Sequence, residues 1–499
     1  MAKRTAIIDI GSNSARVVIY EKTSRYGFHL LCEQKSKVRI GEGAYNNGGY
    51  LQPIGINRAY EALKSFKETI HRYKAHKVIA VATSALRDAP NQKEFIDMIK
   101  QQLAISINVI DGKKEARFGA LAASNLLPIV DGISIDIGGG SSDLALIQNG
   151  KIIDTYSLDL GTVRIKELFF DKYDSIDTAR KKAKAYIKDA LKNLPDSFKS
   201  HLAIGIGGTT RAIGKGIMKT NNYPLDKIHA FRYSFKKHKS YLKDISKQSF
   251  KDLKKFHIKK SRYDTIKEGS LIFYEILKYI EATEVITSGV GVREGVFLND
   301  LLRGDNYTFN STINPSLISL LDRFVSYNYE SNHTRYKLHI ASKLYEILQN
   351  KIQDSFKYKL ELNYALKLSH IGDIINVYKS HNHAYYITTQ ELNYKLEHNQ
   401  IVLISMLLKM DGKELVDDEL FEYYKSLLPP KDTFRWLSFI YTITLYIYDT
   451  SQHTDIEFTF KNNTLYIKSS KSLYMAREKI NQLQKPTPFD IVIEDTSVI

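Results

Sequence analysis

The chain has 499 residues, of which 43% are hydrophobic and 25% are charged, close to the globular average. This composition excludes collagen-like, coiled-coil and largely disordered proteins, and the length predicts about three domains. Lysine and arginine number 72 against 55 acidic residues, a formal charge of +17. Such an excess attracts nucleic acids, acidic membranes and phosphorylated molecules alike, so it predicts only an anionic partner.

Cys32 is the only cysteine, so no disulfide can form within the chain and a disulfide-stapled secreted fold is excluded. Polar residues between Asp9 and Arg16 interrupt the first apolar stretch before it reaches the length of a signal peptide. The longest apolar runs, such as 401–408, fall short of the ~20 residues that a transmembrane helix needs. We therefore expect a soluble, cytoplasmic protein without a membrane partner.

Strand and helix patterns alternate over residues 1–125. Residues 5–20 predict a β-hairpin, and they are followed by a helix over 56–73, a strand over 77–82, a helix over 92–103 and a strand over 106–110. Asp111 and Gly112 then precede a helix over about 113–123, which places Glu115 in its first turns. This alternation predicts an α/β lobe.

Residues 126–308 repeat the opening pattern of an apolar strand, an aspartate and a glycine-rich turn, which indicates an internal duplication. Two more glycine-rich turns follow short strands, at 207–211 and 288–295. We therefore predict a second α/β lobe and a cleft between the lobes. Residues 309–428 show amphipathic helical patterns and predict an all-α domain. Residues 429–499, with two strands around an Asn-Asn turn and a short helix, predict a small α/β domain.

The glycine turns predict phosphate binding, because glycine lets successive backbone N–H groups approach an anion and nearby polar side chains add donors. A tight hairpin is the alternative for any single turn, but four turns after strands favour phosphate. The candidate residues are Ser12, Asn13, Ser14, Gly138, Gly139, Gly140, Ser141, Gly207, Gly208 and Thr209.

Three aspartates are candidate metal ligands. Asp9 and Asp136 each end an apolar strand before a glycine turn, and Asp143 follows shortly after. Such carboxylates can hold Mg²⁺ against phosphate oxygens, and another divalent or a monovalent cation stays open. A hydrogen bond from the aspartate to its own turn is the alternative, and the equivalent placement in both halves favours the metal.

Six segments occur in order over about the first 300 residues: AIIDIGSNSARVVIY, TSALRDA, VIDGKKEAR, SIDIGGGSSDLALI, AIGIGGTTRAI and SGVGVREG. Together they resemble the exopolyphosphatase/guanosine pentaphosphate phosphohydrolase family, in its long form. This resemblance implies a two-lobed actin-like, ribonuclease H-like ATPase-superfamily fold, then an all-α HD-like domain and a small α/β domain. It also implies a homodimer.

The resemblance further implies the roles of individual residues. Glu115 matches the catalytic base, with Lys114 in place of the acid that precedes the base in the family. Asp136 and Asp143 match an acidic pair at the metal and the attacking water. Three arginines match groups that contact the substrate phosphates: Arg16, Arg87 and Arg293. Taken singly, Glu115 is equally typical of a helix start and each arginine of a surface ion pair, and the shared motifs favour a site.

The helical block carries Ser369 and His370 where the metal-binding His-Asp pair of an HD domain would fall, so we predict a degenerate HD motif without a second metal site. Basic clusters at 236–239, 254–255 and 259–262 are typical of solvated surfaces, or alternatively form a positive path toward the cleft. Nucleic acid is disfavoured as a partner, since no recognised nucleic-acid-binding module is visible.

These observations predict a phosphohydrolase. It releases terminal orthophosphate from inorganic polyphosphate, converts guanosine pentaphosphate to tetraphosphate, or does both, with Glu115 activating water and Mg²⁺ and arginines stabilising the phosphates. Two alternatives stay open. One is an ATP-dependent kinase or switch on the same fold, and the other is a non-catalytic sensor of alarmones or polyphosphate.

Overall fold

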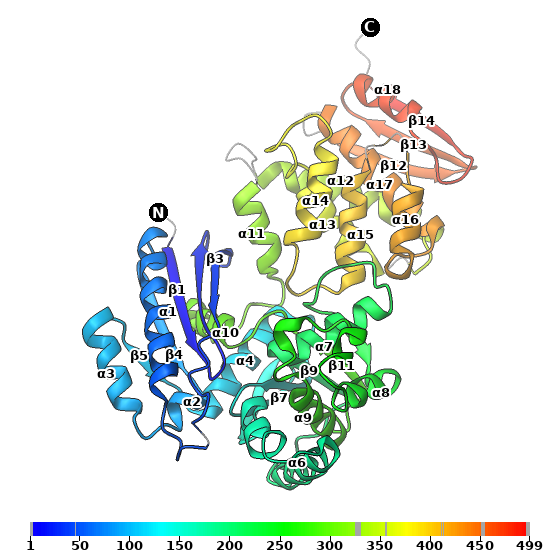
Figure 1. The fold of residues 1–499 in the computed structure, drawn as a ribbon. Coiled ribbons are helices and arrows are strands. Elements are labelled where there is room, and N and C mark those ends of the chain that lie inside the picture. The colour runs from blue at the N-terminus through cyan, green and yellow to red at the C-terminus, as the bar shows by residue number, and fades with distance from the viewer. Residues whose placement is uncertain are drawn as a thin grey trace. The chain divides into compact units, whose positions relative to one another are not determined.

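The computed structural model describes residues 3–44, 46–324, 331–354, 357–410, 412, 414–450 and 455–495. The chain divides into two compact units, Met1–Pro315 and Ser316–Ile499 (Figure 1). Within the described ranges, no helix is long and apolar enough to cross a membrane. The predicted order of two α/β lobes, a largely helical region and a small C-terminal sheet is confirmed.

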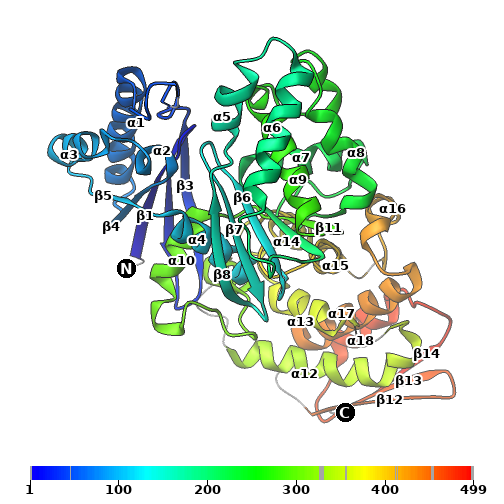
Figure 2. The same ribbon diagram turned by 90° about the horizontal axis from the view of Figure 1, so that it is seen from below.

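The first lobe is built on a five-stranded sheet of order β3-β2-β1-β4-β5. Its strands are β1 Lys3–Ile10, β2 Ala15–Lys22, β3 Phe28–Ser36, β4 Lys77–Ala82 and β5 Ile107–Val109. Helices α1 Pro53–Arg72 and α3 Gln92–Leu103 pack on one face, against Ala6, Ile8 and Ile10 of β1 (Figure 2). Because side chains alternate along a strand, Asp9 lies on the opposite face.

The second lobe repeats this topology in a six-stranded sheet of order β10-β11-β9-β6-β7-β8. Its strands are β6 Gly132–Ile137, β7 Ser142–Gln148, β8 Lys151–Leu158, β9 Leu202–Ile206, β10 Arg232–Ser234 and β11 Glu284–Thr287. In both lobes three antiparallel strands in succession are followed by parallel strands. The shared order supports the duplication that the sequence indicates. One face is covered by α6 Ile176–Leu191, α7 Gly207–Thr220, α8 Phe235–Ile245 and α9 Ile266–Tyr279.

Two helices pack on the sheet of the lobe to which they do not belong in sequence. Helix α4, Gly112–Leu126, follows the first sheet but packs its alanines on the free face of the second sheet. Helix α10, Val292–Leu301, follows the second sheet but stacks Phe297 on Tyr20 of β2, with ring centroids 4.4 Å apart. The sequence places α4 in the first lobe because it continues that lobe's strand and helix alternation, whereas burial of its apolar face joins it to the second.

The second unit contains the helices α11 Pro315–Phe324, α12 Ser331–Leu348, α13 Lys359–Leu368, α14 Ser380–Glu391, α15 His398–Lys409, α16 Asp418–Tyr424, α17 Lys431–Thr450 and α18 Tyr474–Gln482. Strands β12 Ile456–Lys461, β13 Thr464–Ser469 and β14 Asp490–Asp495 form one sheet. The break predicted at residue 429 precedes α17, which packs on α12 and α13 as well as on α18.

The expected degenerate HD position is occupied by an internal hydrogen bond and an ion pair. The ammonium of Lys337 on α12, which is fully buried, donates to Ser369 Oγ at 2.9 Å, and His370 Nδ1 lies 3.1 Å from Asp373 Oδ2. In the described part of the chain, no group of three or more His, Cys, Asp or Glu side chains is arranged to hold a metal ion.

Candidate active site

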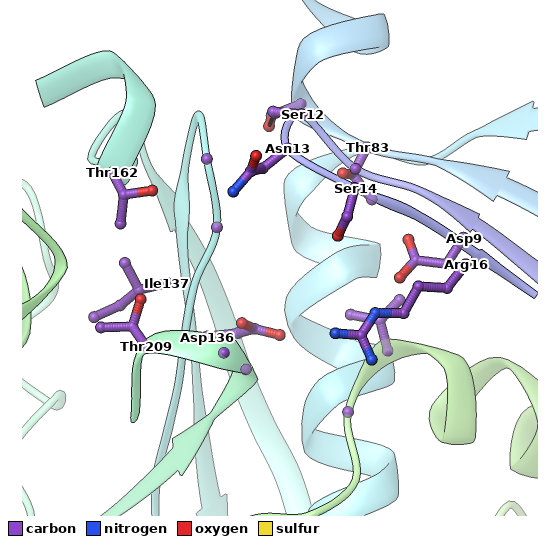
Figure 3. Close-up of a pocket in the computed structure, with 18 of the residues that line it drawn as sticks. Asp9, Ser12, Asn13, Ser14, Arg16, Thr83, Asp136, Ile137, Thr162 and Thr209 are labelled. Atoms are coloured by element: carbon purple, nitrogen blue, oxygen red, sulfur yellow. Dashed lines mark hydrogen bonds between the residues drawn. The ribbon is translucent and has the colours of Figure 1, made fainter. Parts of the chain in front are cut away.

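One pocket of the first unit collects residues from both lobes (Figure 3). The first lobe contributes the β1–β2 turn and the start of the short helix α2, Ser84–Arg87, and the second contributes the turns after β6 and β9. The pocket is lined by Asp9, Gly11, Ser12, Asn13, Ser14, Arg16, Thr83, Ser84, Glu115, Asp136, Ile137, Gly138, Gly139, Thr162, Gly207, Gly208, Thr209, Arg211, Arg262, Thr265, Gly291, Val292 and Arg293.

On the first-lobe side, a cross-strand ladder places cations beside a carboxylate. Asp9 of β1 pairs with Arg16 of β2, which pairs with Lys35 of β3. Glu33, two residues along β3, accepts from Arg16 Nη1 at 2.6 Å and from Arg293 Nη1 at 2.8 Å. One carboxylate thus holds two arginines at the pocket. Figure 3 shows Arg16 and Asp9 together on this side of the pocket, with Asp136 on the other.

The cations at this side are crowded. Burial, followed by the charges of Arg16 and Arg262, lowers the pKa of Lys35 to about 8. Burial and the Arg16 charge likewise lower the pKa of Arg262. An anion among these three side chains would relieve their mutual repulsion, which makes this side of the pocket suited to phosphate.

On the second-lobe side, the equivalent ladder is acidic. Asp136 of β6 pairs with Asp143 of β7, which pairs with Ser157 of β8. Asp143 lies outside the pocket, 3% exposed, and its two carboxylate oxygens accept from Ser141 Oγ at 3.2 Å and from Ser157 Oγ. Burial raises the pKa of Asp136 to about 6, an effect that Arg211 opposes and Asp9 reinforces. The duplicated hairpins therefore face each other with opposite charge.

Glu115 enters the pocket from the first turn of α4, where Asp111 caps the helix by accepting from the Lys114 N–H at 2.7 Å. Burial raises the pKa of Glu115 well above its ordinary value, and Asp143 and Asp136 raise it further. Arg87 opposes this shift: its Nη1 lies 3.4 Å from Glu115 Oε2. A buried carboxyl with a raised pKa is suited to accept a proton near neutral pH.

Two of the predicted glycine turns are helix starts. Helix α7 begins at Gly207, whose φ of +82° favours glycine, and a Cβ there would overlap Asp136 Oδ1. Helix α10 begins after Gly291, whose N–H donates to Glu294 Oε2 at 2.7 Å. Arg211 ties the two starts together by donating to the carbonyl oxygens of Ser288 at 2.8 Å and Val290 at 3.3 Å. The first N–H groups of a helix bind anions well, so both starts suit a phosphate.

The pocket brings together most of the residues that the sequence singles out. Those that line it are Asp9, Ser12, Asn13, Ser14, Arg16, Glu115, Asp136, Gly138, Gly139, Gly207, Gly208, Thr209 and Arg293. Four predicted site residues lie outside the lining: Arg87, Gly140, Ser141 and Asp143. Of these, Arg87 contacts the lining residue Glu115, and Ser141 contacts Asp143, which also lies outside the lining.

Several lining residues were not identified as site residues from the sequence. Arg211 follows the GGTT motif, and Arg262, on the short 3-10 helix Lys260–Arg262, belongs to a predicted basic cluster. The guanidinium of Arg262 lies against Gly208. The other members of that cluster, and the lysines at 236–239 and 254–255, do not line the pocket. Thr83 and Ser84 begin the TSALRDA segment, where only Arg87 was singled out, and Thr162 and Thr265 lie between the motifs.

The carboxylates of the pocket fit a divalent cation. Asp9 and Asp136 line the pocket from opposite lobes and carry hard oxygen atoms, and Mg²⁺ typically binds through one or two carboxylates plus substrate phosphates rather than through three or more protein ligands. Burial raises the pKa of Asp9, although Arg293 and Arg16 lower it, and Asp9 and Asp136 each add to the repulsion that Glu115 feels. A cation between buried carboxylates would offset that repulsion.

Comparison with known proteins agrees with this geometry. The family model of the Ppx/GppA phosphatases matches residues 18–304, more than half of the chain. The chain belongs to the Ppx/GppA phosphatase family. The matched region includes every pocket-lining residue except those of the first β-strand, those of the turn after it, and Arg16 of β2.

Relatives of known structure share the two-lobed part. The Ppx/GppA family member of Aquifex aeolicus is 27% identical, with a TM-score of 0.52 over 61% of this chain and 99% of its own. An exopolyphosphatase from Cytophaga hutchinsonii is 23% identical, with a TM-score of 0.55 over 62% of this chain and all of its own, and it shows the same fold.

A curated relative shares the same region in sequence. A bifunctional 3-dehydroquinate synthase/phosphatase of Fusobacterium nucleatum is 33% identical over an alignment of 300 residues, and the match covers 57% of this chain. The match spans 44% of the length of that relative.

Proposed function

We propose that this Ppx/GppA phosphatase releases the terminal orthophosphate of inorganic polyphosphate, converts guanosine pentaphosphate to tetraphosphate, or does both. One observation carries the proposal: a largely buried carboxyl with a raised pKa, Glu115, opens into the same pocket as four arginines and two helix starts. This combination supplies a base for water and donors for phosphate oxygens.

In the proposed reaction Glu115 takes a proton from a water that attacks the terminal phosphorus. The new P–O bond forms as the bond to the bridging oxygen breaks, and the shortened chain leaves with its electrons. Arg16 and Arg293 offset the charge on the phosphate oxygens in the transition state, and the N–H groups at the starts of α7 and α10 orient the chain. Glu33 keeps both arginines in place.

Asp9 and Asp136 are the proposed ligands of Mg²⁺, or of another cation in its place. Bound there, the ion would neutralise phosphate charge and polarise the oxygens of the reacting group. In this proposal Asp143, which does not line the pocket, acts through its charge, which raises the pKa of Glu115. Ser141 and Ser157 donate to its two carboxylate oxygens.

Phosphate release from polyphosphate, guanosine pentaphosphate and ATP, each offered separately with and without Mg²⁺, tests the proposal. Glu115→Gln should lower kcat by about two to four orders of magnitude, the usual contribution of a general base, and leave substrate binding near its original strength. Glu94→Gln, an exposed glutamate of α3, is the matched control.

Near-normal turnover in Glu115→Gln would remove this residue as the base. Turnover of ATP alone, with transfer to an acceptor, would favour the kinase alternative. Binding of the phosphorylated compounds without any release would favour the sensor.

A further inference from the structure

A second cavity lies beside helix α4, on a different face from Glu115. It has a volume of ≈750 Å³, and it shares no lining residue with the candidate active site. The start of α4 forms one wall and strand β8 forms the other. The cavity is lined by Asp111, Gly112, Lys113, Lys114, Arg117, Thr155, Tyr156 and Ser157.

The cavity is strongly cationic. Lys113, Lys114 and Arg117 line it and are all exposed. Neither lysine forms an ion pair with any described residue, and Arg117 contacts the ring of Tyr307, with 5.6 Å between guanidinium carbon and ring centroid. The one acidic lining residue, Asp111, caps α4, so the lining holds three cationic side chains and one acidic side chain. Unneutralised cations on one concave surface attract an anion.

The spacing of the cations indicates the class of anion. Lys113 and Arg117 are four residues apart on the helix, so they point to the same side with their Cβ atoms about 5–6 Å apart. Lys114 is their neighbour, and Thr155 and Ser157, which share one face of β8, line the opposite wall. A single phosphate cannot contact charges spread over a helical turn as well as two or more linked phosphates can.

This cavity is also connected to the reacting groups. Gly112 packs so closely on β8 that a Cβ would overlap Ser157 Oγ and would lie 3.5 Å from Asp143 Oδ1. Ser157 in turn donates to Asp143, whose charge acts on Glu115. A ligand that spans α4 and β8 would therefore restrain the turn that carries Glu115.

We propose that this cavity is a second site, which binds an anion with two or more linked phosphates through Lys113, Lys114 and Arg117. Both an inorganic chain and a nucleotide with a diphosphate group carry this chemistry. The binding stands apart from the proposed function, since it requires no turnover.

Calorimetric titration of the Glu115→Gln protein with tripolyphosphate tests the proposal, because this background avoids hydrolysis. We expect two classes of site. Adding Lys113→Ser and Lys114→Ser should weaken binding at one class of site about tenfold or more and leave binding at the other class unchanged. The two lysines are replaced together because each exposed charge pair contributes modestly. Lys64→Ser with Lys67→Ser, two exposed lysines of α1, is the charge-matched control.

Hydrogen exchange locates the ligand independently. Tripolyphosphate should protect the amides of 112–118 and 151–158, and the serine variants should lose this protection while they keep that of the turn at 207–211. Guanosine tetraphosphate in place of tripolyphosphate distinguishes a nucleotide from an inorganic source, and protection by either supports the site. A single class of site in both proteins, or equally tight binding of sulfate, would overturn the proposal.

Discussion

Arg87 lies outside the pocket, yet it contacts the side chain that would accept the proton of the attacking water. The sequence motif matches it to a substrate-phosphate arginine, whereas its Nη1 donates to the Ile110 carbonyl oxygen at 3.2 Å and lies 3.4 Å from Glu115. Its position makes it a residue that contacts Glu115 and lowers the pKa of that carboxyl, while Arg16 and Arg293 line the pocket.

Arg87→Ala should therefore lower kcat more than it raises KM. The Arg87 charge lowers the pKa of Glu115, so its loss raises that pKa. A base works only when deprotonated, and the fall of kcat at acidic pH should move to higher pH. The pH profile of kcat measures this shift, with Arg72→Ala, at an exposed position of α1, as control. A raised KM with an unshifted profile would instead indicate direct phosphate contact.

At the scale of the element, the start of α7 depends on a residue without a side chain. Gly207 combines a φ of +82° with close contact to Asp136, so the helix can begin directly under the carboxylate. Gly150, in the β7–β8 turn, has a φ of +72° and no atom within 4 Å of a Cβ built there. The same substitution at the two glycines therefore distinguishes backbone strain, which both positions share, from steric overlap, which occurs only at Gly207.

Gly207→Ala should cost stability and lower phosphate release by at least about tenfold, because the new methyl group displaces Asp136. Gly150→Ala carries only the strain of its backbone, so it should lose about 1 kcal/mol of stability and keep full activity. Thermal unfolding and phosphate release, measured on both variants, check the comparison. Equal activity losses would show that displacement of Asp136 is not the cause.

Much of this arrangement could be predicted from the sequence, because the strands carry their own signals. The ends of β1 and β6 place Asp9 and Asp136 on the face opposite the helix-covered core, as period-two alternation requires. The starts of α7 and α10 were expected as turns, since glycines before a helix are indistinguishable from glycines in a hairpin.

The tertiary contacts of the site could not be predicted. Glu33 reaches Arg293 across 260 residues of chain, and Thr162 and Thr265 lie in segments without a motif. Helix α4 carries no sequence signal for the sheet it covers, because its small apolar residues suit either lobe. Pairings of this kind depend on the packing of whole elements.

A buried acid on α9 links the stability of the second lobe to pH. Glu268 is 1% exposed, and burial raises its pKa to about 7. Because the pKa of Glu268 in the folded state is above its ordinary value, the contribution of the protonated carboxyl to stability is fully present below about pH 4.5. This contribution is lost as the pH rises through about 7. Glu268→Gln should therefore become the more stable protein at pH 8, by on the order of 3 kcal/mol relative to its difference at pH 4.5.

Amide hydrogen exchange in α9, corrected for intrinsic rates, gives the free energy of opening at each pH. The exposed Glu61→Gln on α1 should show no such pH dependence. A constant difference between Glu268→Gln and the wild-type protein from pH 5 to 8 would contradict the shifted pKa.

At the scale of the whole molecule, every pocket-lining residue belongs to the first compact unit. The Aquifex relative, whose chain is covered to 99%, matches only 61% of this chain, so a protein of the shorter length exists in the family. We expect a fragment of residues 1–314 to fold and to release phosphate within about threefold of the full-length rate, since a compact unit with its own core can fold alone. Phosphate release by the folded fragment, or its absence, shows whether residues 315–499 are required for turnover.

The exchange of α4 and α10 between the sheets means that the backbone passes from one lobe to the other twice. A protease that cuts only one of these passages would leave the halves associated and joined through the second. Helices α4 and α10 pack on each other beside these two passages, so we expect the lobes to move relative to one another mainly by rotation about this region. Opening of the pocket would then resemble the movement of a hinged clamp, in which Asp9 and Asp136 separate while the packing of Phe297 on Tyr20 stays intact.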